Sequence, residues 1–419
     1  MTNTKRLRNN TIALAIIQIL NYLLPFLVLP YVSRIFTVDK FGVIFFAQVL
    51  IDYFWRFVMF GFDLSGVQTI AKNRNDFNVI NQNFNSIVST QFLLYCFAYL
   101  ILTLMTLFIP KFQFDWLIYH LTFLGLLGQI LLFTWFYQGM ERMKFITILN
   151  IITRSCFLIF VFIFIKKADD YILYPLFNSI SFLIAGAISI FFIKKQFNIN
   201  FKLPKVVEIF KTLQYSSQFF LTKVAIALYR STNAFVLGLT VTSSAVAYYV
   251  AADKIFWGIF ALYLTFVNAL FPYMTKNKDI VFFKKMLKYL VLLSILASVF
   301  LFITSKYLIL IFYSDKYIEA IKILQIFSLS FVFYIFVDTL GFPLLGAFGY
   351  VKETNQCYIL GGIFNILGIL SFYYLNLINI YSIAILVSIT YLVMFLHRIY
   401  YVKKYKLLNI KENTWNSKI

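Results

Sequence analysis

Two neighbouring apolar segments decide the fold: SSQFFLTKVAIALYRSTNAFVLGL (Ser216–Leu239) and AVAYYVAADKIFWGIFALYLTFVNALF (Ala245–Phe271). Each exceeds the length of about 20 apolar residues that a helix needs to cross a bilayer. Four charged residues lie within them: Lys223, Arg230, Asp253 and Lys254. On insertion scales each such charge costs roughly 2.5–3.5 kcal/mol unless it faces protein or water. The two segments therefore predict a polar cavity inside a membrane protein.

The composition of the whole chain agrees with this prediction. Of its 419 residues, 62% are hydrophobic and 13% are charged, whereas a soluble domain has about 25% charged residues. The apolar runs are continuous, unlike the alternating strands of about 10 residues in a β-barrel. We expect an all-α polytopic membrane protein with twelve transmembrane helices. The predicted spans are Thr11–Ser33, Phe41–Phe62, Ser86–Ile109, Trp116–Tyr137, Ile146–Ile165, Ile172–Ile193, Ser216–Leu239, Ala245–Phe271, Met286–Phe312, Ile321–Leu345, Cys357–Leu375 and Ile378–Val402.

The basic residues set the expected orientation. The net charge of +21 would suggest a nucleic-acid partner in a soluble protein. Here, with the N-terminus inside, 24 Lys and Arg fall on the cytoplasmic side, 8 on the outside and 5 within spans. This threefold bias follows the positive-inside rule and places both termini in the cytoplasm. The basic N-terminal segment leads into an apolar run without a cleavage site, so we expect a retained first helix.

The longest internal loop divides the chain into two sets of six spans. We therefore expect an N-terminal lobe over residues 1–193, a basic cytoplasmic linker over 194–215, a C-terminal lobe over 216–402 and a cytoplasmic tail over 403–419. Because six is even, both sets enter the membrane in the same orientation. This arrangement permits a parallel repeat about an axis along the membrane normal.

Polar residues form stripes on two of the predicted helices. Ser216, Lys223 and Arg230 are spaced by seven and so share one helix face. Lys223 could line the cavity or extend its charged end to the membrane interface. Arg230 lies too near the middle of the span to reach the interface, so we expect it to line the cavity. In span two, Asp52 and Arg56 are four residues apart and can pair directly. This pair is either structural, or a functional one in which protonation of Asp52 releases Arg56.

The remaining acids in the spans, and the cysteines and histidines, say less about function. Adjacent Asp253 and Lys254 point about 100° apart on a helix, and Asp338 precedes Gly341 and Pro343, which can open the backbone. Asp63 closes span two. The three cysteines and two histidines show no metal-ligand spacing, and there is no phosphate-binding loop. We expect neither a metal site nor an enzyme.

Several short motifs occur in order along the chain: Asn21–Pro25, Leu29–Arg34, Phe41-Gly42, Tyr53, Gly61-Phe62, Trp135–Thr147, Tyr248–Lys254 and Leu270–Tyr273. Together, in this order and spacing, they resemble the motifs of Wzx-type polysaccharide flippases of the multidrug/oligosaccharidyl-lipid/polysaccharide exporter superfamily. The resemblance covers essentially all twelve spans. Near position 247 the family often has glycine, and this chain has Ala247.

The resemblance implies two six-helix lobes around a central cavity and a role in the bacterial cytoplasmic (inner) membrane. The implied substrate is an undecaprenyl-diphosphate-linked oligosaccharide, such as an O-antigen repeat unit, moved from the cytoplasmic to the periplasmic leaflet. No cofactor is implied beyond a coupling ion, H⁺ or Na⁺. Implied partners are membrane lipids, a polysaccharide polymerase and a chain-length regulator.

Independently, a diphosphate needs cationic partners inside a bilayer, where arginine gives bidentate contacts and lysine a point charge. The candidate cations are Arg56, Lys223, Arg230 and Lys254. The candidate coupling or pairing acids are Asp52, Asp63, Asp253 and Asp338.

Two other functions remain open from the residues. A drug/cation antiporter of the same fold would need a cavity of net negative charge, and the spans hold five cations against these four acids. A membrane glycosyltransferase or polymerase would need a large loop or a soluble domain, and no loop here exceeds about 23 residues.

Overall fold

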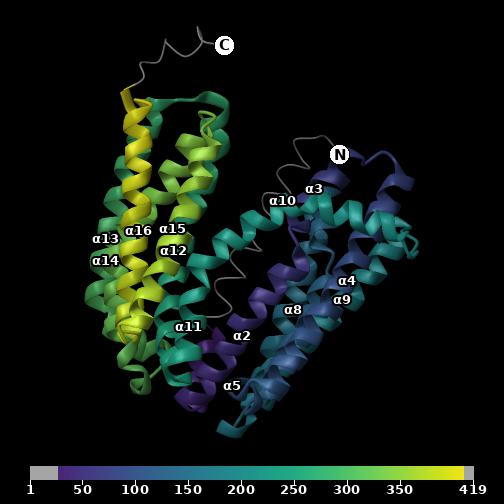
Figure 1. The fold of residues 1–419 in the computed structure, drawn as a ribbon, viewed down its shortest axis with the longest axis horizontal. Coiled ribbons are helices and arrows are strands. Elements are labelled where there is room, and N and C mark those ends of the chain that lie inside the picture. The colour runs from purple at the N-terminus through teal and green to yellow at the C-terminus, as the bar shows by residue number, and fades with distance from the viewer. Residues whose placement is uncertain (1–26, 410–419) are drawn as a thin grey trace. The chain divides into compact units, whose positions relative to one another are not determined.

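The computed structural model describes residues 27–409, without the side chains of residues 221–222 and 225–230. Every regular element among these residues is helical. Ten helical segments in this range are long and apolar enough to cross a membrane, which makes the protein a multi-pass membrane protein. The chain forms two compact units, Met1–Val224 and Ala225–Ile419. Figure 1 follows the elements of both units by colour along the chain.

The first unit contains the elements from α2 to most of α10. Their bounds are α2 (Val38–Met59), α3 (Phe62–Lys72), α4 (Phe77–Phe108), α5 (Pro110–Gln113), α6 (Trp116–Leu131), α7 (Thr134–Gly139), α8 (Met143–Phe164), η1 (Ala168–Ile172), α9 (Leu173–Phe197) and α10 (Val206–Arg230). Two of the predicted spans are broken by residues with positive φ: α2 meets α3 at Phe60, and α6 meets α7 at Phe133.

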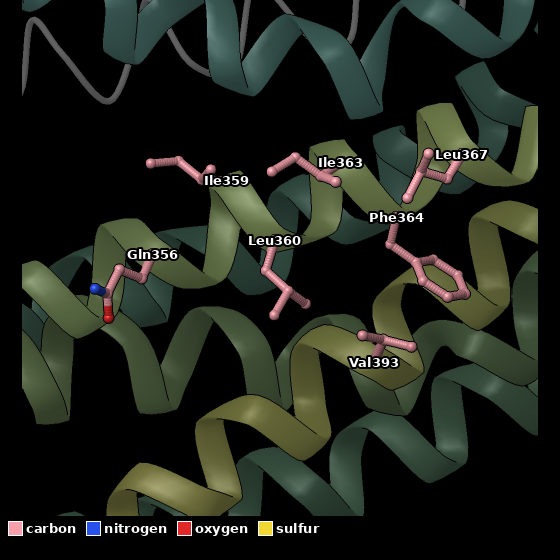
Figure 2. A pocket seen from close by; sticks show the side chains of 7 residues that line it. All are labelled: Gln356, Ile359, Leu360, Ile363, Phe364, Leu367 and Val393. Carbon is pink, nitrogen blue, oxygen red and sulfur yellow. The ribbon is translucent and has the colours of Figure 1, made fainter.

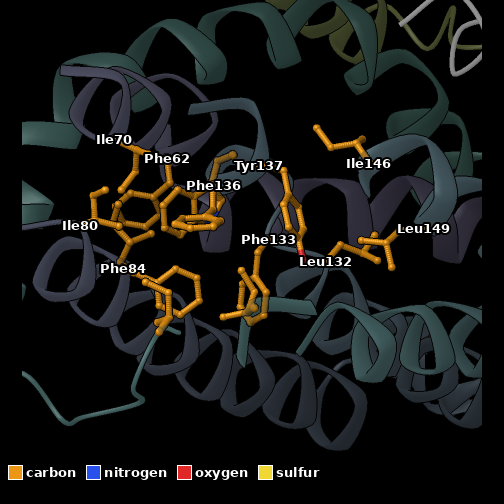
Figure 3. Close-up of a cluster of buried hydrophobic side chains, with 14 of the residues drawn as sticks. Phe62, Ile70, Ile80, Phe84, Leu132, Phe133, Phe136, Tyr137, Ile146 and Leu149 are labelled. Carbon is orange, nitrogen blue, oxygen red and sulfur yellow. The ribbon is translucent and has the colours of Figure 1, made fainter. Parts of the chain in front are cut away.

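Aromatic side chains fill the core of this unit around the short helix α7. Trp135 and Phe136 of α7 are buried and pack against Phe84 of α4, with ring centroids 5.8 and 5.2 Å from its ring. Figure 3 shows this cluster, to which α3 adds Phe62 and Ile70. Burying large rings gives a strong apolar driving force where helices meet. The core therefore fixes α3 and α7 next to each other.

Helices α6 and α9 pack closely, and Gly128 of α6 lies against the backbone of α9. A Cβ added to Gly128 would lie 2.5 Å from the backbone carbon of Phe182. One added to Gly125 would lie 2.9 Å from the hydroxyl of Ser179, and the nearest backbone atom of α9 would be at an ordinary contact distance of 3.5 Å. A hydroxyl can rotate away, but the backbone of α9 cannot. We expect Gly128→Ala to destabilise the purified protein by about 1–3 kcal/mol and Gly125→Ala to cost less. Thermal unfolding in detergent would measure the difference, and equal effects would contradict the prediction.

The second unit contains the remaining elements, with α14 packed against α12, α13 and α16. Their bounds are α11 (Thr232–Thr240), α12 (Ser243–Asn277), α13 (Ile280–Phe312), η2 (Asp315–Tyr317), α14 (Glu319–Leu340), η3 (Gly341–Gly346), α15 (Val351–Tyr374), α16 (Ile380–Lys404) and η4 (Leu407–Asn409). The segment η3 is a π-helix that contains Pro343. Proline removes a backbone donor, and π-helical turns are frequent at functional sites.

Span one and span seven differ from the prediction in what the structure describes. Predicted span one, Thr11–Ser33, lies mostly outside the described residues. The part of it that is described belongs to a helix over residues 27–35. The prediction of one continuous helix over Ser216–Leu239 is wrong: α10 begins at Val206, ends at Arg230, and is followed by the separate helix α11. The helix also takes up residues 206–215, which the sequence analysis assigned to the linker. Apolar periodicity alone does not show where a polar Ser-Thr-Asn sequence, here at residues 231–233, interrupts a helix.

Candidate functional site

The site of the first unit is built on the break between α2 and α3. Phe60 and Gly61 both adopt left-handed backbone conformations, with φ of 41° and 78°. A Cβ on Gly61 would lie 2.7 Å from the Cβ of Phe219 and 2.8 Å from the backbone nitrogen of Phe220. Glycine is thus required both for the turn and for the close approach of α10. The break brings α10 directly against the ends of α2 and α3.

Polar and aromatic contacts hold the first half of α10 in place. The hydroxyls of Ser65 on α3 and Ser216 on α10 lie 2.8 Å apart, and both residues are buried. The rings of Phe60 and Phe220 stack with centroids 4.5 Å apart. Nearer the start of α10, the contacts with the rest of the unit are exposed hydrogen bonds.

At that end, Gln82 of α4 donates a hydrogen bond of 2.6 Å to the carboxylate of Glu208. This bond lowers the pKa of Glu208 below its usual value, because it stabilises the charged form. The Tyr215 hydroxyl donates to the side-chain oxygen of Gln68 at 2.7 Å. Tyr215 and the adjacent Ser216 therefore both bind side chains of α3, and Glu208 binds α4.

Two ion pairs form at this junction. Arg56 donates through Nε and Nη2 to one carboxylate oxygen of Asp52, at 3.0 and 2.9 Å. This confirms the pair predicted from their spacing. Lys223 pairs with the carboxylate of Asp63, 160 residues earlier in the chain. Lys223 thus lies on the same side of α10 as Ser216, as their spacing predicts.

A polar cavity of about 140 Å³ lies between the two pairs, within the first unit. The four charged side chains are only partly exposed, between 26 and 38%. A charge pair held in this way is more strongly coupled than a surface pair. The residues that line the cavity are Asp52, Trp55, Arg56, Met59, Gly61, Asp63 and Lys223.

The cavity has no net formal charge, since two acids balance two cations. An incoming anion would compete with the carboxylates for Arg56 and Lys223. Protonation of a carboxylate would release its cation for that anion. The arrangement can therefore couple the binding of an anion to the state of two acids.

The other four predicted residues belong to the second unit. Arg230 is the last residue of α10, and its side chain lies outside the described set. On α12, Lys254 is exposed and Asp253 is half-buried. Asp338 is half-buried on α14, three residues before the π-helix η3. The structure thus brings together Asp52, Arg56, Asp63 and Lys223.

A further buried cation was missed by the sequence analysis, which counted Arg398 with the cytoplasmic C-terminal end. Its side chain on α16 is 0% exposed. The guanidinium carbon lies 5.1 Å from the ring centroid of Tyr358 on α15. None of its three nitrogens has a hydrogen-bond partner among the described residues. The only sequence signal was its place within a predicted span.

Nothing in the described part of the chain resembles a metal centre, because no three His, Cys, Asp or Glu side chains there are grouped to hold an ion. His120 contacts Thr106 and Tyr99, at 3.2 Å in each case. This histidine therefore has ordinary hydrogen-bonding partners near the end of the membrane span.

The chain is similar in sequence to proteins of polysaccharide biosynthesis. Residues 7–278 match the family described as polysaccharide biosynthesis protein. A protein of Escherichia coli (strain K12) named "Putative O-antigen transporter" is 27% identical over 373 residues, which cover 87% of this chain and 90% of that protein.

Solved structures share the fold at low sequence identity. The lipid II flippase MurJ in an inward closed conformation has a TM-score of 0.69 at 17% identity, with 96% of this chain and 89% of MurJ covered. An inward-facing multidrug resistance transporter of the MATE family, in the MOP superfamily, has a TM-score of 0.65 at 11% identity, with 95 and 99% covered. The sequence match and the shared fold agree with the motifs quoted above. The chain belongs to the polysaccharide biosynthesis protein family.

Proposed function

We propose that the protein moves an undecaprenyl-diphosphate-linked oligosaccharide, such as an O-antigen repeat unit, from the cytoplasmic to the periplasmic leaflet. The observation that carries this proposal is the paired arrangement of Arg56 with Asp52 and Lys223 with Asp63 around one cavity. A diphosphate headgroup has the charge and the oxygen acceptors to replace the carboxylates on both cations. The family match and the named relative support the same class of substrate.

In this mechanism Arg56 and Lys223 bind either their carboxylate partners or the diphosphate of the substrate. With the carboxylates ionised, Arg56 and Lys223 are neutralised within the protein. With a carboxylate protonated, its cation binds the diphosphate more strongly. Protonation of a carboxylate and binding of the diphosphate are then linked, and alternating access would carry the headgroup across the membrane. Within the second unit, Arg230 and Lys254 are further proposed cations for the substrate, and Asp253 and Asp338 are further proposed coupling acids.

The orientation and partners belong to the same proposal. Both termini would lie in the cytoplasm, so that α15 begins at the cytoplasmic side. A polymerase and a chain-length regulator are the proposed partners, because an exported repeat unit must be joined into a polymer. A Na⁺ gradient is the alternative to protons as the driving force.

A drug/cation antiporter is the second candidate, because the MATE structures share the fold. A site for cationic drugs would need net negative charge in the absence of substrate, and the described cavity is balanced. The family match also favours the polysaccharide substrate.

The test uses purified protein in liposomes that contain a lipid-linked oligosaccharide. We expect the glycan to become accessible from the opposite leaflet only in vesicles with the protein, and a flippase-null strain to regain its surface polysaccharide. Efflux of ethidium from the same strain is the contrasting measurement. Drug efflux without glycan movement would favour the antiporter and overturn the proposal.

Replacing Asp52 by asparagine should change the pH dependence of transport. The variant keeps the size and the hydrogen-bonding oxygen of the side chain but removes the carboxylate. Arg56 then loses its ionic partner at every pH, so transport should vary less with pH than in the wild type. Initial rates between pH 5.5 and 8.5 would show this. A profile identical to that of the wild type would assign Asp52 to structure alone.

A further inference from the structure

An apolar groove runs along one face of α15 in the second unit, with α16 on its other side. Its volume is about 430 Å³. Figure 2 shows Leu360 and Phe364 of α15 directed toward Val393 of α16, with Gln356 at one end of the groove and Leu367 at the other. Among its lining residues, which are Gln356, Ile359, Leu360, Ile363, Phe364, Leu367 and Val393, only Gln356 is polar.

The groove has a cationic end. Lys352 precedes Gln356 by four residues, so both lie on the same face of α15, and Lys352 is exposed in the first turn. The N-terminus of a helix also favours negative charge. The neighbouring acid, Glu353, accepts a hydrogen bond of 2.7 Å from Tyr405. On the groove face this end therefore presents the cation of Lys352, with the charge of Glu353 held by Tyr405, and the rest of the face is apolar.

The length of the groove matches one leaflet of a bilayer. Gln356 and Leu367 are eleven residues apart on one helix, which is about 16 Å at 1.5 Å per residue. Half of a hydrocarbon core of about 30 Å is about 15 Å. The side chains along it are well exposed, at 53% for Ile363 and 57% for Leu367. A chain that follows this face would run from the interface to the middle of the bilayer.

We propose that this groove binds the polyprenyl chain of the lipid-linked substrate, with its phosphate at Lys352 and Gln356. The inference rests on the proposed function and deepens it by assigning a site for the tail. The lining side chains follow a single helix face, which suits one chain rather than the two acyl chains of a phospholipid. The lipid would remain bound along α15 while its headgroup enters the protein.

The experiment measures binding of undecaprenyl phosphate to the full-length protein in nanodiscs, by native mass spectrometry. Ile363→Trp fills the groove, and we expect about tenfold weaker binding, as for the loss of one or two buried methylene contacts. Ile303→Trp is the matched control: it makes the same change on α13, where Ile303 is 67% exposed. We expect this control to bind as the wild type does.

A second pair of variants tests the cationic end. Lys352→Gln should weaken binding about fivefold, the effect of one lysine near an anionic headgroup. Lys285→Gln on α13, also at an exposed lysine, should have no effect. An excess of phosphatidylglycerol should not displace undecaprenyl phosphate from the wild type. Displacement at equal concentration would overturn the proposal in favour of an ordinary phospholipid site.

Failure of the groove and failure of the proposed function give different results. If the wild type binds undecaprenyl phosphate and Ile363→Trp binds it equally well, the groove assignment is wrong and the function stands. If the wild type neither binds this lipid nor restores surface polysaccharide, the proposed function falls, and the groove assignment with it.

Discussion

Replacing Lys223 by methionine should reduce transport of the lipid-linked oligosaccharide by about ten- to a hundredfold, the range expected for loss of a hydrogen-bonded charge. Methionine is an unbranched side chain of similar length that carries no charge. It removes the cation that pairs with Asp63 at the cavity. Complementation of a flippase-null strain, with protein quantified in the membrane, would measure the effect.

Three further variants separate a structural pair from a transporting cation. Lys223→Arg keeps the charge and should retain most of the activity. Asp63→Asn frees Lys223 and should retain more activity than Lys223→Met. The exchanged pair, Asp63→Lys with Lys223→Asp, restores the attraction but moves the cation to α3. If the exchanged pair transports as well as the wild type, the pair is structural, and Lys223 has no role in the substrate pathway.

The sequence predicts the parts of this site that depend on local spacing. The pair of Asp52 and Arg56 follows from a separation of four residues on one helix, and it is present. The common face of Ser216 and Lys223 follows from a separation of seven. Both are properties of a single regular helix, so apolar and polar periodicity is sufficient to find them.

The pair of Lys223 and Asp63 could not be predicted in the same way. It depends on the direction that α3 takes after the break, which the positive φ of Phe60 and Gly61 determines. It also depends on α10 approaching that glycine within contact of its backbone. Gly61 stands in the sequence as one glycine in an apolar run, and nothing near it shows which helix will pack there.

Arg398 was missed for a different reason. Basic residues near the end of a last apolar segment are ordinarily cytoplasmic, and counting them as such supports the topology. The structure instead continues α16 to Lys404 and packs α15 and η3 around the arginine. A methyl group on Gly341 of η3 would lie 3.2 Å from Nη2 of Arg398. Arg398 is buried because α15, α16 and η3 pack around it, so the sequence of α16 alone does not predict its burial.

Arg398→Met should stabilise the protein by about 1–4 kcal/mol, because replacing buried charge by an apolar side chain of similar length is often stabilising. The wild-type guanidinium is 0% exposed, and its nitrogens have no hydrogen-bond partner in the described part of the chain. Its contact with the Tyr358 ring contributes about 2 kcal/mol in a desolvated setting, less than the cost of burying an unpaired charge. Arg398→Lys is the control, because it retains the charge and should unfold no later than the wild type. Thermal unfolding in detergent compares the three proteins. A lower unfolding temperature for Arg398→Met than for Arg398→Lys would mean that the charge is satisfied in the membrane and contributes to the fold.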